Sequence, residues 1–308
     1  MKVHKDVLCR ELEPKEYKDL LIQIAGIIEE CVNFGTHILV WCSEKPKNDG
    51  SDSTIILIFR HIIESLDAIT VLIKHGCADP TELLLRSIFE ALIGLEYILE
   101  KDTAQRALSY KVAHAHRQIS LYKKLDTTTD QGKQFKKILS NDSTIKNIAL
   151  PAVDTNKLIA NLENMLKKPQ YVSVNTEWQN YKKANKKNPN WFSLFGGPRN
   201  IIDLAHYVNR SGLYEFLYRI WSQYVHVTGV FRNITRDDSG NGAIIGLRSP
   251  KNIQVYSSLS LSMSMAAYTK MIKYYIPDKE KDFQEWYIKN IRKWYLQLSS
   301  TKRIIKID

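Results

Sequence analysis

Charged residues on an apolar stretch are the first feature of this sequence that could carry chemistry. In residues 83–99 the clearly polar side chains are Arg86, Ser87, Glu90 and Glu96. Arg86 and Glu90 are four residues apart, so a helix places them on one face. Because an unpaired charge in an apolar interior is very costly, we expect the two to pair with each other or with a neighbouring helix.

The stretch 53–75 repeats this arrangement, with Arg60 and Glu64 four residues apart and Asp67 one turn further on. Two helices would then each bring an arginine and a glutamate towards the interior. One interpretation is a structural lattice of salt bridges that fixes the register of the helices. The other is a polar pocket in the core of a helical bundle, where sites are often built. In that pocket Arg60 and Glu64 are candidate substrate-binding residues.

A third polar stripe lies in residues 213–227. Tyr218, Ser222 and His226 recur every four residues, and Arg219 stands seven residues before His226. A histidine at the end of such a run can act as an acid or base near neutral pH. It can equally be a core histidine with satisfied hydrogen bonds. The polar neighbours that we expect to bind substrate beside it are Tyr218, Ser222 and Tyr224.

These motifs resemble those of an uncharacterised family of bacterial helical proteins. In that family an Arg-Ser-x-x-Glu helix, here Arg86 to Glu90, is followed far downstream by Tyr-x-x-x-Ser-x-x-Val-His, here Tyr218 to His226. Trp191-Phe192-Ser193 precedes the second motif, as in the family. The resemblance covers about residues 50–230. It implies a helical fold and no established activity.

The spacing of Arg219 and His226 is also similar to the Arg-x4–6-His motif of the HEPN helical domains. Many of these domains are metal-independent ribonucleases of toxin and phage-defence systems. The resemblance implies that Arg219 and His226 orient and activate a ribose 2′-hydroxyl and stabilise the scissile phosphate, commonly in a homodimer. The sequence departs from the usual motif at Ile220, where many members carry a polar residue.

The net charge of +11 is unevenly distributed along the chain. Residues 1–122 hold 14 lysines and arginines against 18 acids, whereas residues 123–190 hold 13 lysines against 6 acids. Such a surplus favours polyanions such as RNA, although it also suits a solvated lysine-rich face. The aromatic residues in this segment that are candidates for stacking on bases are Trp178, Tyr181 and Trp191.

Helices must position all of these residues. Apolar residues at helical spacing predict helices over 14–43, 53–75, 79–99, 102–125, 131–140, 154–168, 200–209, 213–227, 253–275 and 278–298. Gly76 predicts the end of one helix, and Asp79, Pro80 and Glu82 predict the start of the next with a capping box. Residues 169–198 are predicted to form a long irregular connection.

The predicted fold is therefore all-α. It is a bundle of about nine or ten helices with at most one short β-hairpin near 240–250. We expect a single domain over residues 1–308, with a polar, lysine-rich insertion at about 127–198.

The cysteines and the N-terminus indicate a cytoplasmic protein. The four cysteines, none of them in a Cys-x-x-Cys pair, are Cys9, Cys31, Cys42 and Cys77. This pattern favours neither a disulfide framework nor a zinc site. The N-terminus has no secretory signal, and no stretch is long and apolar enough to span a membrane. The sequence also holds no Gly-rich phosphate loop, and we predict no metal and no cofactor.

Two hypotheses follow from these patterns. In the first, a bacterial stress or phage-defence protein binds or cleaves RNA. His226 is then the acid or base, Arg219 holds phosphate, and Arg86 with Glu90 orients the site. In the second, the polar residues are structural. The chain is then a non-enzymatic interaction module that pairs with a second copy or another protein, or a sensor of a small molecule.

Overall fold

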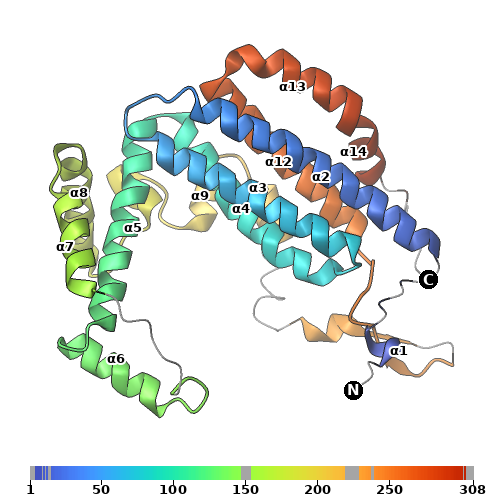
Figure 1. Ribbon diagram of the computed structural model, residues 1–308, viewed down its shortest axis with the longest axis horizontal. Coiled ribbons are helices and arrows are strands. Elements are labelled where there is room, and N and C mark those ends of the chain that lie inside the picture. The colour runs from blue at the N-terminus through green and yellow to red at the C-terminus, as the bar shows by residue number, and fades with distance from the viewer. Residues whose placement is uncertain are drawn as a thin grey trace. The chain divides into compact units, whose positions relative to one another are not determined.

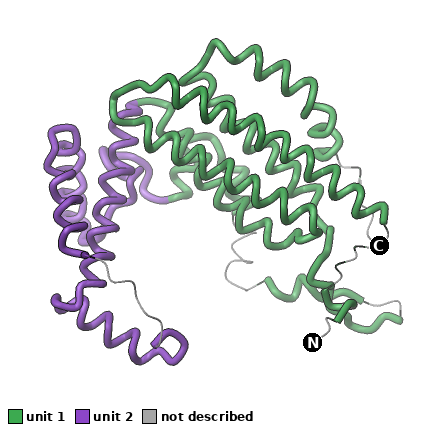
Figure 2. Tube along the Cα trace, in the orientation of Figure 1, with its two compact units in different colours: residues 1–101, 201–308 green, residues 102–200 purple. Residues whose placement is uncertain are grey.

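A computed structural model describes residues 4–8, 10, 12, 15–146, 154–218, 229–236, 239–300 and 302. The chain forms two compact units (Figure 2): unit 1, residues 1–101 and 201–308, and unit 2, residues 102–200. Both consist of helices, which confirms the predicted all-α class. The one sheet in the described part of the chain is an antiparallel hairpin of β1 (Ile234–Arg236) and β2 (Gly242–Ile244), slightly earlier than predicted.

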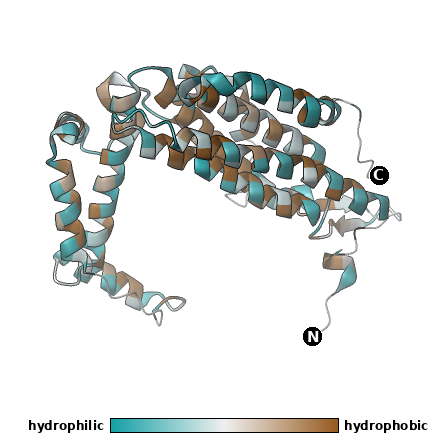
Figure 3. Cartoon of the chain, turned by 45° about the horizontal axis from the view of Figure 1, so that its top comes forward, coloured by the Kyte–Doolittle hydropathy of each residue, from teal (hydrophilic) through white to brown (hydrophobic). Residues whose placement is uncertain are grey.

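Four long helices form the body of unit 1. They are α2 (Lys15–Ser43), α3 (Asp52–Lys74), α4 (Ala78–Glu100) and α12 (Ile253–Tyr275). Helix α2 packs on α3, α3 on α4, α4 on α12 and α12 back on α2, so the four close a ring around one core (Figure 1). Apolar and polar residues alternate around each helix (Figure 3), which is the pattern that buries one face.

Tyr268 of α12 contacts α2 and α3. Its side chain is fully buried, and its hydroxyl donates to the Cys31 carbonyl at 2.7 Å. A Cβ atom on Gly35 would collide with that hydroxyl, so glycine is required there. Phe59 of α3 meets the Tyr268 ring edge-on, with ring centres 5.7 Å apart. One residue thus ties three of the four helices together.

Short connections fix the helix ends. The Asp52 carboxylate accepts from the backbone N–H groups of Lys47 and Asn48 and from the Tyr275 hydroxyl, which closes the loop before α3. Gly76 ends α3 in the left-handed region (φ 69°), as predicted. The predicted capping box is wrong, because α4 begins after Cys77 with no side-chain capping bond. The glutamate of that motif, Glu82, points instead towards Arg232.

The remaining elements of unit 1 are shorter. The C-terminal segment runs through η4 (Pro277–Lys279), α13 (Glu280–Trp286), η5 (Tyr287–Ile291) and α14 (Arg292–Leu298), and packs on α2 and α12. Trp286 stacks on Phe34 of α2 and donates its indole N–H to Glu30 at 2.7 Å. The shorter pieces are α1 (Lys5–Leu8), α9 (Ile201–Tyr207) against α4, α10 (Ser211–Leu213), the π-helical turn η2 (Tyr214–Tyr218) and η3 (Val230–Asn233).

Unit 2 is built around one helix, α5 (Thr103–Leu125). Packed on it are α6 (Asp130–Asn141), α7 (Thr155–Leu166), α8 (Pro169–Asn185) and the 3-10 turn η1 (Trp191–Gly196). Helix α8 lies where an irregular connection was predicted. Pro169 starts it at the first helical position, and Val174 and Trp178, one turn apart, are buried in the core of the unit. Unit 2 spans residues 102–200, and the lysine-rich stretch at about 127–198 lies within it.

Candidate functional site

The structure brings three of the predicted site residues together in unit 1. They are Arg86 and Glu90 on α4 and Tyr218 at the end of η2. The Arg86 Nη2 atom donates to the Tyr218 hydroxyl at 2.6 Å, and its Nε donates to the Glu90 carboxylate at 3.3 Å. The guanidinium carbon also lies 4.1 Å from the centre of the Tyr218 ring. The Arg-Ser-x-x-Glu helix and the start of the second motif are thus in contact.

Two aromatic rings pack against the Tyr218 ring of this cluster. Tyr214, which is buried, stacks on Tyr218 with ring centres 4.9 Å apart, and Phe89 lies 6.1 Å from the same ring. The Arg86 side chain is 20% exposed, and its Nη1 atom is buried without a hydrogen-bond partner among the described residues. Leaving a buried donor unsatisfied costs about 1–3 kcal/mol, so this nitrogen would gain from an anion or a water molecule.

Tyr218 is held in its neutral form. Burial raises the pKa of its hydroxyl, and the nearby Glu90 carboxylate raises it further, although Arg86 acts in the opposite direction. The phenol therefore stays protonated at neutral pH and can both donate and accept a hydrogen bond. On the adjacent face of α4, Ser87 shares a hydrogen bond of 2.7 Å with His61 of α3.

The other half of the predicted site lies outside the described residues. These positions are Arg219, Ser222, Tyr224 and His226. Their predicted roles in phosphate binding and in acid or base catalysis stay predictions. Tyr218 immediately precedes the first of them in the sequence.

The prediction that Arg60 and Glu64 point into the interior is wrong. They do form the ion pair expected from their spacing, at 3.0 Å, but their side chains are 57% and 60% exposed. The buried face of α3 is defined by its apolar residues, such as Phe59, Ile62 and Leu66. Arg60 and Glu64 lie on the opposite face, in solvent, where an ion pair contributes about 0–1 kcal/mol.

Two other ion pairs among the described residues each contain a buried glutamate. The sequence analysis did not predict the arginine partner of either glutamate. Arg210 donates to Glu96 at 2.6 and 3.0 Å, and Glu96 is almost fully buried. The hydrogen bond with Glu96 raises the pKa of Arg210. Glu96 stood out in the sequence as a charge on an apolar helix. Its partner lies 114 residues away, and no local spacing reveals it.

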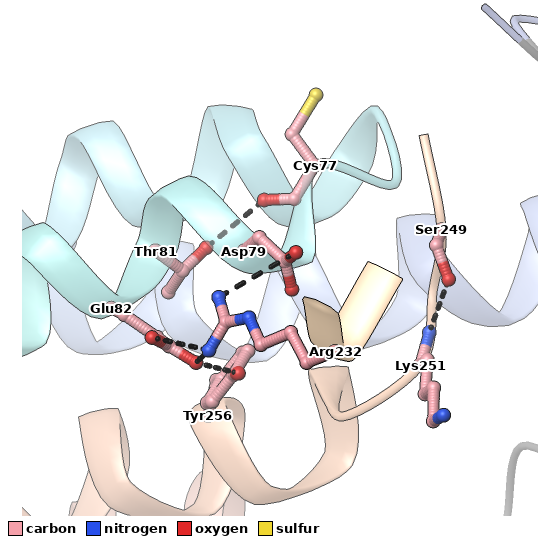
Figure 4. A network of polar contacts seen from close by, with 8 residues as sticks. All are labelled: Cys77, Asp79, Thr81, Glu82, Arg232, Ser249, Lys251 and Tyr256. Atoms are coloured by element: carbon pink, nitrogen blue, oxygen red, sulfur yellow. Dashed lines mark hydrogen bonds and ion pairs between the residues drawn. The ribbon is translucent and has the colours of Figure 1, made fainter. Parts of the chain in front are cut away.

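Arg232 of η3 makes the second buried pair (Figure 4). It donates to both oxygens of Glu82 at 2.9 and 3.0 Å and lies 3.6 Å from Asp79. Tyr256 of α12 donates to the same Glu82 carboxylate, and burial together with that carboxylate raises the pKa of its phenol. Nearby, the Thr81 hydroxyl donates to the Cys77 carbonyl at 3.2 Å. This network joins η3, α4 and α12.

Unit 2 presents a different kind of surface. All 13 lysines between positions 123 and 187 are exposed. Among the described residues, Lys133 is the one member of this set in an ion pair, a loose contact of 3.7 Å with Asp130. We call these 13 lysines the basic surface.

The aromatic residues predicted to stack on bases belong to the core of unit 2. Trp178 is 5% exposed and lies flat on the His116 ring, with ring centres 3.6 Å apart. Lys182 lies 5.1 Å from the centre of the same indole. Tyr181 and Trp191 are partly buried and pack against this core. Trp178 therefore has no free face for a base, because its neighbours within unit 2 already cover it.

The described residues contain no group of three or more His, Cys, Asp or Glu side chains that could hold a metal ion. Cys31 and Cys42 are buried free thiols. Burial raises the pKa of both, that of Cys42 to about 12, so neither is a reactive thiolate at neutral pH. No helix in the described ranges has the length and apolar character needed to cross a bilayer.

The fold and the motif residues therefore define a helical protein with an Arg-Ser-x-x-Glu helix in contact with Tyr218. Comparison of the sequence with known protein families gives one match. Residues 52–242 match DUF5677, a family of unknown function. The chain belongs to that family. The match runs from the start of α3, through the whole of unit 2, to the first residue of β2. No curated protein and no solved structure matches the chain.

Proposed function

We propose that this chain binds RNA through the basic surface of unit 2. Unit 2 holds 17 lysines and arginines against 7 acids, whereas unit 1 holds 27 against 26. Almost all of the net charge of +11 thus belongs to the smaller unit. The observation that carries the proposal is that these lysines are exposed and, with the exception of Lys133, have no ion-pair partner among the described residues. Unpaired cations gain most from phosphates, because binding releases the counterions of the nucleic acid.

The densest part of the basic surface is the end of α8. Lys182 and Lys183 lie in its last turn and Lys186 and Lys187 directly follow it, and all four are exposed. Because Trp178 is buried beside them, charge rather than base stacking would supply the affinity. Contacts to phosphate alone carry no sequence information, so we expect binding that depends strongly on salt and weakly on sequence.

Two quadruple variants of the full chain test this proposal. The first replaces Lys182, Lys183, Lys186 and Lys187 by glutamate. The control makes the same change at four exposed lysines of unit 1, namely Lys270, Lys273, Lys289 and Lys293. Both variants lower the net charge equally. We expect the first to weaken binding of a labelled single-stranded RNA by at least about tenfold, because several phosphate contacts are lost, and the control by less than about twofold.

Fluorescence anisotropy at several salt concentrations provides the measurement. The logarithm of the affinity should fall steeply with the logarithm of the salt concentration for the wild type, and less steeply for the α8 variant. Equal losses in the two variants would show that net charge alone matters. The absence of binding by the wild type at low salt would refute the proposal.

RNA cleavage at the Arg86 cluster is the second candidate function, and the contact of Arg86 with Tyr218 favours it. In this proposal His226 takes the proton of a ribose 2′-hydroxyl, and that oxygen attacks the adjacent phosphorus. The bond from phosphorus to the 5′-oxygen breaks, that oxygen takes a proton from solvent water, and His226 returns its own proton to the solvent. The products are a 2′,3′-cyclic phosphate and a 5′-hydroxyl. Arg219 and Arg86 would bind the phosphate oxygens, and two copies of the chain would combine their motifs, as the HEPN resemblance implies.

End-labelled RNA in the presence of a metal chelator tests this step. We expect His226→Ala to lose cleavage by about a hundredfold or more, the range typical of a general acid or base, and to keep its affinity for RNA. Tyr218→Phe should lower the rate by less. His206, an exposed histidine of α9 that hydrogen-bonds Ser211, gives the matched control His206→Ala. Equal cleavage by the wild type and His226→Ala would contradict the catalytic role of His226. It would not affect the proposal that unit 2 binds RNA.

The non-enzymatic hypothesis makes a separate prediction at the same residues. If Arg86 and Glu90 have only a structural role in α4, Arg86→Ala should lower the melting temperature and leave the activity on RNA unchanged. Glu90 is 44% exposed, so the uncompensated carboxylate that remains can be hydrated, and the loss should be well below that of a buried pair. Loss of cleavage at an unchanged melting temperature would favour the site. A specific partner protein or a second copy bound at full affinity by this variant would favour the interaction module.

A further inference from the structure

A cavity of about 390 Å³ lies within unit 2, between the end of α5, helix α6 and the residues that follow it. Its apolar wall consists of Leu125, Phe135, Leu139 and Ile145. Three lysines of the basic surface also line it: Lys124, Lys136 and Lys146. The volume is within the range of small-molecule sites, and the combination of an apolar wall with a few charged groups is typical of them.

The corner between α5 and α6 is rigidly built. The Asp126 carboxylate accepts hydrogen bonds from the backbone N–H and the hydroxyl of Thr128. Thr129 caps α6 by accepting from the Gly132 N–H at 3.0 Å. A Cβ atom on Gly132 would overlap the Asp126 carbonyl, so α6 approaches the turn as closely as a glycine permits. The wall of the cavity is therefore a fixed part of the fold.

Helix α6 leaves its apolar side only partly covered. Its main packing partner is α5, and Phe135 and Leu139, one turn apart on the cavity side, are only half-buried. Covering apolar surface stabilises by about 25 cal/mol per Å², so a hydrocarbon body in the cavity would be favourable. The three lining lysines form no ion pair within the described residues. Their charge is complementary to one anionic head group.

We infer that this cavity binds an amphipathic anion of the fatty-acid type, with its carboxylate at the lysines and its hydrocarbon chain against Phe135 and Leu139. A nucleotide fits the lining less well. The polar side chains of the lining residues other than the lysines are those of Thr127 and Ser140, whose hydroxyls offer little to pair with a base. The inference does not rest on RNA binding, because the apolar wall that holds the hydrocarbon chain offers no contact to phosphate, although the three lysines also belong to the basic surface.

Parinaric acid, a fatty acid that fluoresces when it leaves water, tests the inference on the full chain. We expect a saturable rise in fluorescence below the concentration at which the probe forms micelles. The methyl ester of the probe, which has no charge, should bind at least about fivefold more weakly, as expected from the loss of one ion pair of about 1 kcal/mol. Equal binding of acid and ester would overturn the role of the lysines.

Neighbouring lysines of α6 provide the matched pair of variants. Lys136 lines the cavity, whereas Lys137 is exposed next to it and does not. We expect Lys136→Ala to weaken the acid by about fivefold and Lys137→Ala by less than about twofold, since one ion pair separates them. Both should affect RNA binding alike. Equal effects of the two variants on the fatty acid would contradict the inference.

Leu139→Arg tests the apolar wall. It should abolish binding of the probe while the circular dichroism of the chain keeps its helical signal. Undiminished binding in this variant would place the fatty acid elsewhere and overturn the inference. If the variant loses helical signal, the comparison of Lys136→Ala with Lys137→Ala decides, because both positions are on the surface and neither is needed for packing.

Discussion

Unit 1 holds its buried carboxylates in ion pairs, whereas the 13 lysines of the basic surface in unit 2 lie in solvent. Glu82 and Glu96 are buried in unit 1, and each is matched by an arginine from a distant part of the chain. Among the 13 lysines of the basic surface, the one ion pair within the described residues is the loose contact of Lys133 with Asp130. The two units share a fold class and differ in what their charges do. In unit 1 the buried charges fix structure, and in unit 2 the lysines of the basic surface face outward.

The two units also differ in how their cores are packed. The core of unit 1 is enclosed by a ring of four helices, with Tyr268 at its centre. The core of unit 2 lies along one helix, α5. It includes Trp178, which stacks on His116. Local changes in unit 2 should therefore affect one corner of it, whereas loss of a buried charge in unit 1 should weaken the whole bundle.

Removal of Arg232 should produce the largest effect. Arg232→Ala leaves the Glu82 carboxylate buried beside Tyr256, and we expect a loss of about 3 kcal/mol in the free energy of unfolding. The exposed pair gives the control: Arg60→Ala should cost less than about 0.5 kcal/mol. Urea unfolding followed by circular dichroism measures both. Similar losses for the two variants would mean that burial of the pair in unit 1 has no energetic importance.

A glycine in each unit gives the next contrast. Gly132→Ala forces α6 away from the Asp126 carbonyl, which should cost about 1–3 kcal/mol, as overpacking usually does. Gly26→Ala on α2 meets no atom within 4 Å and should stabilise that helix by about 0.5–1 kcal/mol. Hydrogen exchange read by mass spectrometry locates each effect. Faster exchange outside residues 126–141 in Gly132→Ala would contradict a locally built corner.

Acid should weaken unit 2 slightly through His116. Burial lowers the pKa of His116, and Lys182 and Lys123 lower it further, whereas its hydrogen bond with Asn175 acts in the opposite direction. The unfolded chain, with a pKa near 6.5, then takes up a proton before the folded unit does. Stability is therefore complete above about pH 6.5 and falls as the pH drops towards the lower, folded pKa.

The melting temperature measured against pH tests this expectation. His116→Gln should flatten the profile below pH 6.5, except for the part that His114 contributes, because burial also lowers the pKa of His114. An unchanged profile in His116→Gln, or an imidazole that titrates above pH 6.5 in its NMR signals, would contradict the assignment.

The sequence predicted the helices well where local physics decides them. The apolar spacing of 253–275 gave α12 with both ends correct, and Gly76 ended α3 because only glycine adopts its left-handed conformation without cost. The error at 169–198 arose from polar composition. Helix α8 buries only Val174 and Trp178, so its apolar pattern is too sparse to indicate a helix, and contacts with α5 stabilise it instead.

The candidate site was predictable only in part. The four-residue spacing of Arg86 and Glu90 correctly predicted their ion pair, and Tyr218 lies beside them. The same spacing at Arg60 and Glu64 was misleading, because spacing places two residues on one face but does not say which face is buried. The arginine partners of Glu82 and Glu96 come from long-range packing, which no local pattern encodes.

Lysine reactivity in the presence of RNA tests the central contrast most directly. Brief acetylation of the full chain, with and without saturating single-stranded RNA, is followed by mass spectrometry of each lysine. We predict that RNA protects Lys182, Lys183, Lys186 and Lys187 in unit 2 and leaves the exposed Lys270 and Lys273 of unit 1 as reactive as before. Equal protection of both groups, or protection of the unit 1 lysines alone, would contradict the proposal that unit 2 is the RNA-binding part of this chain.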